Sequence, residues 1–168
     1  RTAFERCMAA LEEERRTHDK WNADLQGWLI HAARAFGSYA YGFFERSRGH
    51  YGRAARWYTA SLPPYRELKF DVSQARSLND KAYALALVGY SFKAESAVKD
   101  ALRLRQRLGF GYLIGLSLNT YGIVLTMSER PVSAEYYCRR ALAIFRRVDS
   151  PYGQMLAHRA LSEAYRRD

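Results

Sequence analysis

Cysteine and proline are scarce in this sequence, with two and four copies in 168 residues. Two cysteines cannot supply the disulfide framework of a small secreted domain, so we expect a reducing, cytoplasmic setting. Neither an HExxH motif nor paired CxxC motifs occur, and the histidines show no metal-ligand spacing; they are His18, His31, His50 and His158. The common sequence patterns of a metal site are therefore missing.

Motifs for catalysis are missing as well. Gly109, Gly111 and Gly115 form a glycine-rich stretch, but no strand pattern precedes it and no Gly-Lys-Ser/Thr follows it, as a phosphate-binding loop requires. No nucleophile stands at a motif spacing from a base. We therefore expect a protein that is not an enzyme and that holds no cofactor.

What the sequence does have is a pattern of small and apolar residues that recurs every 40 residues, beginning at Ala54, Ala94 and Ala134. In each copy an apolar or aromatic residue follows four positions later, a second small residue seven positions later and a leucine eight positions later. This spacing places all four residues on one face of a helix. The small residues lie where another backbone must approach closely.

A second helix precedes each of these helices. The small residues Gly42, Ala82 and Gly122 each stand twelve positions before the alanine that opens the pattern. The segments between the two helices hold glycine or proline and are too short for anything but antiparallel neighbours. The sequence therefore predicts an array of stacked helical pairs, because a single pair cannot bury its apolar face alone.

This order of small residues, turn glycine, apolar residue and leucine resembles the tetratricopeptide repeat (TPR), whose common form has a period of about 34 residues. The longer period is similar to the arrays of kinesin light chains, which the segment from Tyr137 to Ile144 resembles most, and of bacterial signal-transduction ATPases and transcriptional activators. The resemblance implies an all-α, right-handed superhelical solenoid of antiparallel helical pairs. A HEAT-like helical repeat has a similar period and is the alternative.

The repeat register also predicts the organisation of the chain. We expect a single array over residues 1–168, as a fragment of a longer protein, with a long helix through Trp28 before the first full repeat. The expected units are the second helix of a partial repeat at 1–17, an irregular repeat at 22–69, repeats at 71–108 and 111–148, and the first helix of a partial repeat at 151–168.

Local motifs predict where individual helices begin and end. Asp71 with Gln74 three residues later has the pattern of a capping box, and Ser150 before Pro151 that of an N-cap followed by a first helical turn. The two prolines at 63–64 predict an early end to the helix that contains Ala54, with a short turn or an extra helical piece after them.

Two further features are explained by helix packing. Cys7 and Cys138 occupy the position that Tyr58 and Val98 occupy in other copies, so we interpret both as small buried side chains. No charged residue occurs from 108 to 128, a length near that of a membrane span. Glycine, serine, threonine and asparagine dilute this stretch and it carries the repeat register, so we expect a buried internal helix and no membrane contact.

Basic residues dominate the charge, with 27 Lys and Arg against 17 Asp and Glu and a net charge of +10. Such a balance favours anionic partners, either a protein or peptide with acidic groups or a nucleic acid. A solvated basic face is the alternative, because several arginines fall on the second helix of a pair, which is usually the outer one; they are Arg139, Arg140, Arg146 and Arg147.

The resemblance implies that the first helix of each pair lines a concave wall. The ligand-binding residues that it implies are Tyr39, Phe43, Arg46, Arg76, Asn79, Tyr83, Asn119, Ile123, Thr126, Arg159, Glu163 and Arg166. Asn79 and Asn119 stand at the same point of consecutive repeats, and the resemblance to light chains implies that such asparagines hold a peptide backbone. The other interpretation is that both cap or bridge neighbouring helices.

Arginines and aromatic residues surround these asparagines. Arg76, Arg159 and Arg166 favour a carboxylate-bearing partner, whereas aromatic residues at this spacing are also typical of core packing. The predicted function is that of a peptide-binding or sensor module of a larger cytoplasmic regulatory protein, in signal transduction or as a scaffold. Nucleic-acid binding through the basic face and self-association through the array ends are the alternatives.

Overall fold

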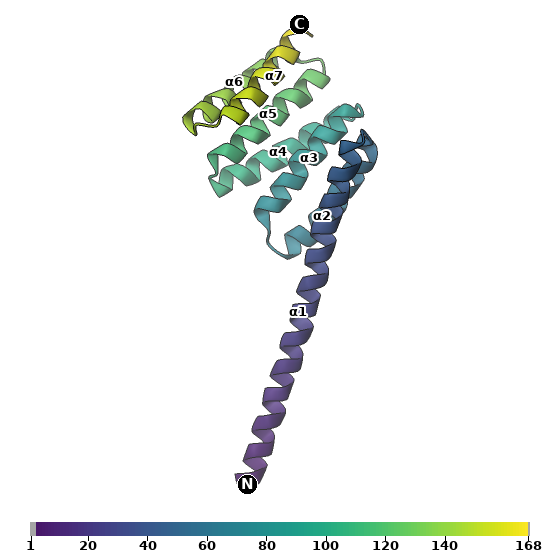
Figure 1. The fold of residues 1–168 in the computed structure, drawn as a ribbon, viewed down its shortest axis with the longest axis vertical. Helices are drawn as coiled ribbons and strands as arrows, with labels where there is room; N and C mark the ends of the chain where they lie inside the picture. The colour runs from purple at the N-terminus through teal and green to yellow at the C-terminus, as the bar shows by residue number, and fades with distance from the viewer. Residues whose placement is uncertain (1–2, 168) are drawn as a thin grey trace.

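The protein is built from helices alone over the residues that its structure, a computed structural model, describes: 3–167 for the backbone, and Ala9 and 11–167 for the side chains. Within that range there are seven helices and no strand (Figure 1). They are α1 (Ala3–Ser47), α2 (Tyr51–Glu67), α3 (Asp71–Leu87), α4 (Ser91–Leu108), α5 (Gly111–Met127), α6 (Pro131–Arg147) and α7 (Pro151–Tyr165). The predicted all-α class is confirmed. The predicted packing position of Cys7 lies outside the described side chains.

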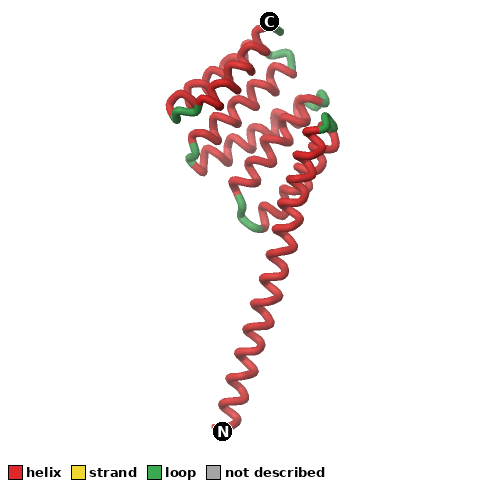
Figure 2. The backbone as a smooth tube through the Cα atoms, in the orientation of Figure 1, coloured by secondary structure: helices red, strands yellow, loops and turns green. Residues whose placement is uncertain are grey.

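The 40-residue period of the sequence reappears in the helix boundaries. Helices α2, α4 and α6 begin at Tyr51, Ser91 and Pro131, each 40 residues after the one before, and α3, α5 and α7 begin with the same offset at 71, 111 and 151. Short turns separate neighbouring helices (Figure 2). Each pair of neighbours is therefore antiparallel, as the turn lengths predict.

All six turns contain one residue with a left-handed backbone, which reverses the chain at the end of each helix. These residues are Gly49, Lys69, Gly89, Gly109, Glu129 and Asp149. In most turns the following N–H donates to a carbonyl five residues back, as from His50 to Glu45 at 2.9 Å and from Tyr90 to Leu85 at 2.9 Å. This closes the last helical turn, so that the same reversal is repeated along the chain.

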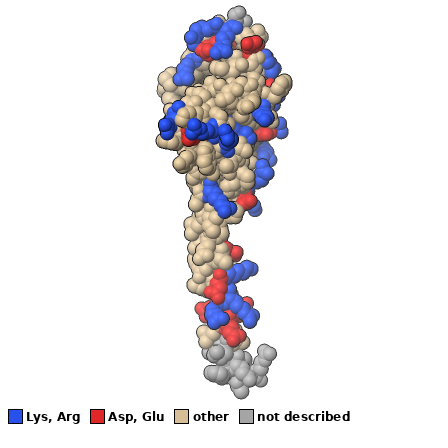
Figure 3. Space-filling view, turned by 90° about the vertical axis from the view of Figure 1, so that its right-hand side faces the viewer, with Lys and Arg blue, Asp and Glu red and all other residues tan. Residues whose placement is uncertain are grey.

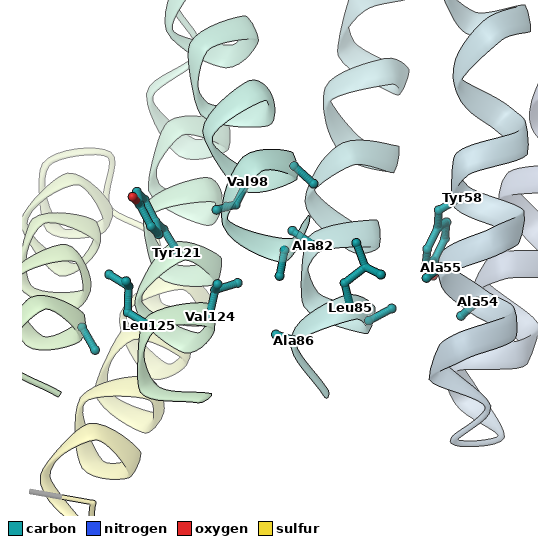
Figure 4. Packing of buried hydrophobic residues seen from close by; sticks show 14 of the residues in the cluster. Ala54, Ala55, Tyr58, Ala82, Leu85, Ala86, Val98, Tyr121, Val124 and Leu125 are labelled. Atoms are coloured by element: carbon teal, nitrogen blue, oxygen red, sulfur yellow. The ribbon is translucent and has the colours of Figure 1, made fainter. Parts of the chain in front are cut away.

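Each helix packs on the next one in the sequence, from α1 on α2 through α6 on α7. Two further contacts join α3 to α5 and α5 to α7, so these three helices form an inner row, while α2, α4 and α6 lie outside it. The consecutive packing is consistent with a helical repeat. Buried alanines, valines and leucines from neighbouring helices form the core (Figure 4).

Close approach between the helices of a pair depends on residues with little or no side chain. Ala54, Ala94 and Ala134 are all fully buried. A Cβ atom added at Gly122 would overlap Cys138 Sγ and would lie 3.2 Å from the Ala134 carbonyl oxygen. The spacing of small residues in the sequence therefore marks the α5–α6 contact. Cys138 is fully buried there, as predicted.

The uncharged stretch from 108 to 128 forms α5, which lies between α4, α6 and the inner helices α3 and α7. Its predicted character as a buried internal helix is confirmed, since residues from Ser117 to Tyr121 are each less than 9 % exposed. None of the helices in residues 3–167 is both long enough and apolar enough to cross a membrane.

Two local predictions were wrong and one is confirmed. Helix α2 continues through both prolines to Glu67, because the backbone angle of proline suits a helix and the buried Pro64 and Tyr65 hold the last turn in the core. Asp71 is the first residue of α3 rather than its cap, and the cap residue Phe70 makes no side-chain bond. Ser150 does cap α7, since its hydroxyl oxygen accepts the Gly153 N–H at 3.1 Å.

The first helix is far longer than the others. Residues 1–17 and the start of the irregular repeat at 22–69 were predicted as separate units. In the structure, the described residues of both belong to one uninterrupted helix, α1, with 45 residues. Only its C-terminal part packs on the array. The rest projects from it (Figure 1).

We predict that Gly122→Ala destabilises the array by about 1–3 kcal/mol, because the new methyl group forces α5 and α6 apart in a packed core. Urea unfolding followed by circular dichroism measures the change. Gly52→Ala is the matched control, since a Cβ at Gly52 meets no atom within 4 Å. Equal stabilities of the two variants would contradict the close-approach argument.

Candidate ligand groove

A groove of about 1020 Å³ runs across the inner helices. Its walls come from α1, α3, α5 and α7, with Tyr51 of α2 and Arg105 of α4 at its edge and floor. Ten of the predicted ligand-binding residues line it, namely Tyr39, Arg46, Arg76, Asn79, Tyr83, Asn119, Ile123, Arg159, Glu163 and Arg166. Residues spread over more than a hundred positions of the sequence thus meet at one surface.

The other two predicted residues lie elsewhere. Thr126 is 1 % exposed, and its hydroxyl donates to the Gly122 carbonyl oxygen at 3.0 Å inside α5. Its assignment to the concave wall was wrong, because this side chain is buried in the core. Phe43 does not line the groove; its side chain is 48 % exposed, with the Arg46 guanidinium 5.0 Å from the ring centroid.

Asn79 and Asn119 stand at equivalent points of α3 and α5. Both are largely buried, at 8 % and 5 % exposed, and both border the groove. Neither Oδ1 atom has a hydrogen-bond partner among the described residues. A buried amide oxygen without a donor costs free energy. Neither side-chain oxygen is therefore engaged in capping or bridging a helix.

At the α1 end of the groove a tyrosine and a carboxylate are tied together. The Tyr39 hydroxyl donates to Asp80 Oδ2 at 2.6 Å, and Arg46 Nη1 lies 3.7 Å from Asp80 Oδ1. The Arg76 guanidinium carbon lies 4.8 Å from the centroid of the Tyr39 ring. Burial, followed by the charge of Asp80, raises the pKa of Tyr39. These contacts join α1 to α3 and fix the shape of this wall.

Arg105 lies at the floor of the groove and is 3 % exposed. Its Nη1 donates to the Leu113 carbonyl oxygen and to Ser117 Oγ, each at 3.0 Å, which ties α4 to α5. Its Nε atom has no partner in the described part of the chain. Burial lowers the pKa of Arg105 to about 10, and the charge of Asp80 opposes this effect.

Arg105 occupies a position that is aromatic in the neighbouring repeats. Tyr65 and Phe145 stand 40 residues before and after it, and both are at most 1 % exposed. A guanidinium therefore replaces a core ring in the middle repeat. Burying a cation in place of a ring is costly unless it is paired.

Sequence reasoning missed two residues that shape the groove, Asp80 and Arg105. Arg105 lies on a second helix of a pair, where arginines were interpreted as solvated. Comparison with Tyr65 and Phe145 at the same register position would have identified it as buried. Asp80 could have been identified from its place four residues after Arg76, which puts both residues on the same side of α3.

Positive charge dominates the groove, with five arginines against the carboxylates of Asp80 and Glu163. Glu163 forms an ion pair with Arg166, and Asp80 lies near Arg46. The other arginines, Arg76, Arg105 and Arg159, form no ion pair with any carboxylate of residues 11–167. The groove thus presents surplus positive charge to whatever enters it.

Outside the groove, basic side chains form several separate groups on the surface (Figure 3). Arg139 of α6 pairs with Glu135 at 2.7 Å and also donates to the Tyr165 hydroxyl. Arg140, Arg146 and Arg147 are exposed. Their position on an outer helix fits the solvated face that the sequence offered as an alternative.

We predict that Tyr39→Phe changes how stability depends on pH. A free tyrosine titrates near pH 10, and the pKa of Tyr39 is raised in the fold, so its contribution to stability is complete below pH 10 and is lost as the pH rises further. Relative to the variant, the wild type should lose about 1.4 kcal/mol for each pH unit above 10. Urea unfolding at pH 8, 9, 10 and 11 tests this. A constant difference throughout would contradict it.

The described residues contain no group of three or more His, Cys, Asp or Glu side chains that could hold a metal ion. The groove offers amides, guanidinium groups and aromatic rings. Comparison with protein-family models and with curated protein sequences finds no match.

Proposed function

We propose that this chain is a TPR-like array, coiled as a right-handed solenoid, that binds an extended peptide segment in its groove without catalysis. The observation that carries the proposal is the pair Asn79 and Asn119, equivalent residues of consecutive repeats that border one groove with no partner for their amide oxygens. The 40-residue recurrence of helix boundaries supports the repeat family.

The asparagines supply hydrogen bonds to the peptide backbone. An amide offers two donors and an acceptor, which match the C=O and N–H groups of an extended chain. A half turn about χ2 exchanges the buried oxygen for the nitrogen, so the amide can present either end to the ligand. Helices α3 and α5 pack directly on each other, which keeps the two amides at a fixed spacing.

The arginines supply the preference for acidic side chains. Arg76 and Arg159 line opposite parts of the groove, on α3 and α7, and lack carboxylate partners among residues 11–167. An incoming carboxylate gains charge-assisted hydrogen bonds from either. Tyr39, Tyr83 and Ile123 offer apolar surface in the same groove. The ligand class that fits is a peptide with acidic groups separated by apolar side chains.

A groove of this kind suits a sensor or docking module of a cytoplasmic regulatory protein. The repeat architecture gives it a long surface without a closed active site. Binding would then recruit or restrain other domains, as in signal transduction or scaffolding.

We predict that Asn79→Ala combined with Asn119→Ala weakens peptide binding by roughly tenfold or more, because two backbone hydrogen bonds are lost. The probe is a displayed library of random peptides, from which binders of the full chain are selected and measured by fluorescence polarisation. Asn22→Ala is the matched control, because Asn22 lies on the projecting part of α1 and contacts His18. Unchanged affinity in the double variant, or a library that yields no binder, would overturn the proposal.

We also predict that Arg76→Gln combined with Arg159→Gln lowers affinity for the selected acidic peptides by roughly 10- to 100-fold, because charge-assisted hydrogen bonds are lost. The dependence of affinity on salt should weaken at the same time. Arg140→Gln combined with Arg147→Gln, both exposed on the outer helix α6, is the control of equal charge change. If the control had the same effect as the double variant, general attraction to a basic protein would explain binding.

A further inference from the structure

Helix α1 has two sides with different surroundings. Its 45 residues span about 68 Å. From His31 onward one side packs on the array, with Ala32, Ala35 and Gly42 buried against it. The helix leaves the array near Trp28, whose ring centroid lies 6.3 Å from that of Phe70. No residue from 11 to 27 is buried.

The side of α1 that points away from the array is apolar. We call it the outer face of α1; it consists of Leu29, Ile30, Ala33, Gly37, Ala40, Tyr41 and Phe44, all of them exposed. Their spacing of three and four residues places them on one side of the helix, opposite the buried positions. Their large side chains are 50–55 % exposed.

Charge is almost absent along this length of helix. Between Leu25 and Phe44 the one charged residue is Arg34, at the margin of the outer face. In Figure 3 a length of helix without Lys, Arg, Asp or Glu follows the charged lower end. A helix that is apolar on both sides is typically buried on both sides. The array covers one side of α1 and leaves the other bare.

We infer that a second copy of this chain covers the outer face, with the two α1 helices antiparallel and the two-fold axis at Gly37. The outer face is nearly symmetric in sequence about this residue: Ile30 and Phe44 each lie seven positions from it, and Ala33 and Tyr41 each lie four. Antiparallel pairing then sets Ile30 against Phe44, and the small Ala33 against the large Tyr41. A closed dimer requires such a self-complementary patch.

Small residues at the centre of the patch allow the two helices to approach closely. A Cβ at Gly37 would meet no atom within 4 Å, so the fold of one copy does not need glycine there. Glycine within a helix costs about 0.5–1 kcal/mol relative to alanine. Nothing among the described residues of the single chain offsets this cost, whereas a second helix crossing at Gly37 would.

An aromatic cluster at one end of the patch provides contact area. Tyr41 lies 5.0 Å from Trp57 of α2 and 6.1 Å from Phe44, between ring centroids, and Trp57 is 39 % exposed. Aromatic side chains bury roughly 150–250 Å² each, so these three half-exposed rings offer roughly 300 Å² per copy, to which Leu29 and Ile30 add. The total lies below the roughly 600–1,000 Å² per partner of a standard interface, so we expect a dimer at the weak end of that class.

Sedimentation equilibrium of the full chain at several concentrations tests the inference. The wild type should be a dimer, and Gly37→Glu should raise its dissociation constant by roughly 100-fold or more, because it buries two like charges at the axis. Gly27→Glu is the matched control: it lies on the same helix with no atom near its Cβ, to the side of the outer face, and should stay dimeric. Helicity should be the same in all three proteins.

Cysteine cross-linking tests the antiparallel arrangement. In a Cys7→Ser background, a mixture of Ala33→Cys and Tyr41→Cys chains should form a disulfide-linked heterodimer, and Ala33→Cys alone should not cross-link with itself. A monomeric wild type at all concentrations would overturn the inference and leave the face to a different partner. A dimer that survives Gly37→Glu would place the interface elsewhere. The groove is not part of this surface, so either result leaves the peptide-binding proposal untouched.

Discussion

Close contact between the two helices of a pair is the constraint on which the rest of the structure depends. Ala54, Ala94 and Ala134 are fully buried, and a Cβ added at Gly122, on the helix opposite Ala134, would lie 3.2 Å from the Ala134 carbonyl oxygen. Short turns join these helices, and each of the six turns contains one left-handed residue that reverses the chain. Repetition of one contact therefore sets the course of the chain, and the inner row of helices follows from it.

Much of this was readable from the sequence because the constraint is local. A small residue at a fixed spacing predicts a close helix contact, and the 40-residue register gave the helix pairs, the burial of Cys138 and α5, and most of the groove residues. The register did not predict burial correctly where burial depends on which side chains pack opposite a position. Thr126 has the right spacing for the groove, but its side chain is buried and bonds within α5. The prolines of α2 break a helix in isolation, whereas the burial of Pro64 and Tyr65 retains it here.

The groove shows how one repeat differs in structure from its neighbours through a single substitution. In the repeats on either side, the position of Arg105 holds a ring that fills the core. The exchange brings a positive charge under the groove and ties α4 to the start of α5 through Leu113 and Ser117. Pattern alone did not reveal this, because arginine on an outer helix ordinarily reaches solvent. The information lay in the difference between equivalent positions rather than in the pattern they share.

Contacts between neighbours alone also govern how such a chain comes apart. Helices that touch only the next pair can be lost one pair at a time from either end, since each pair removed breaks a single interface. A peptide lying along α3, α5 and α7 would touch several pairs at once. The free energy of peptide binding would then be available only while all of these helical pairs are folded. The bound array would therefore unfold cooperatively, whereas the free array would unfold pair by pair from its ends.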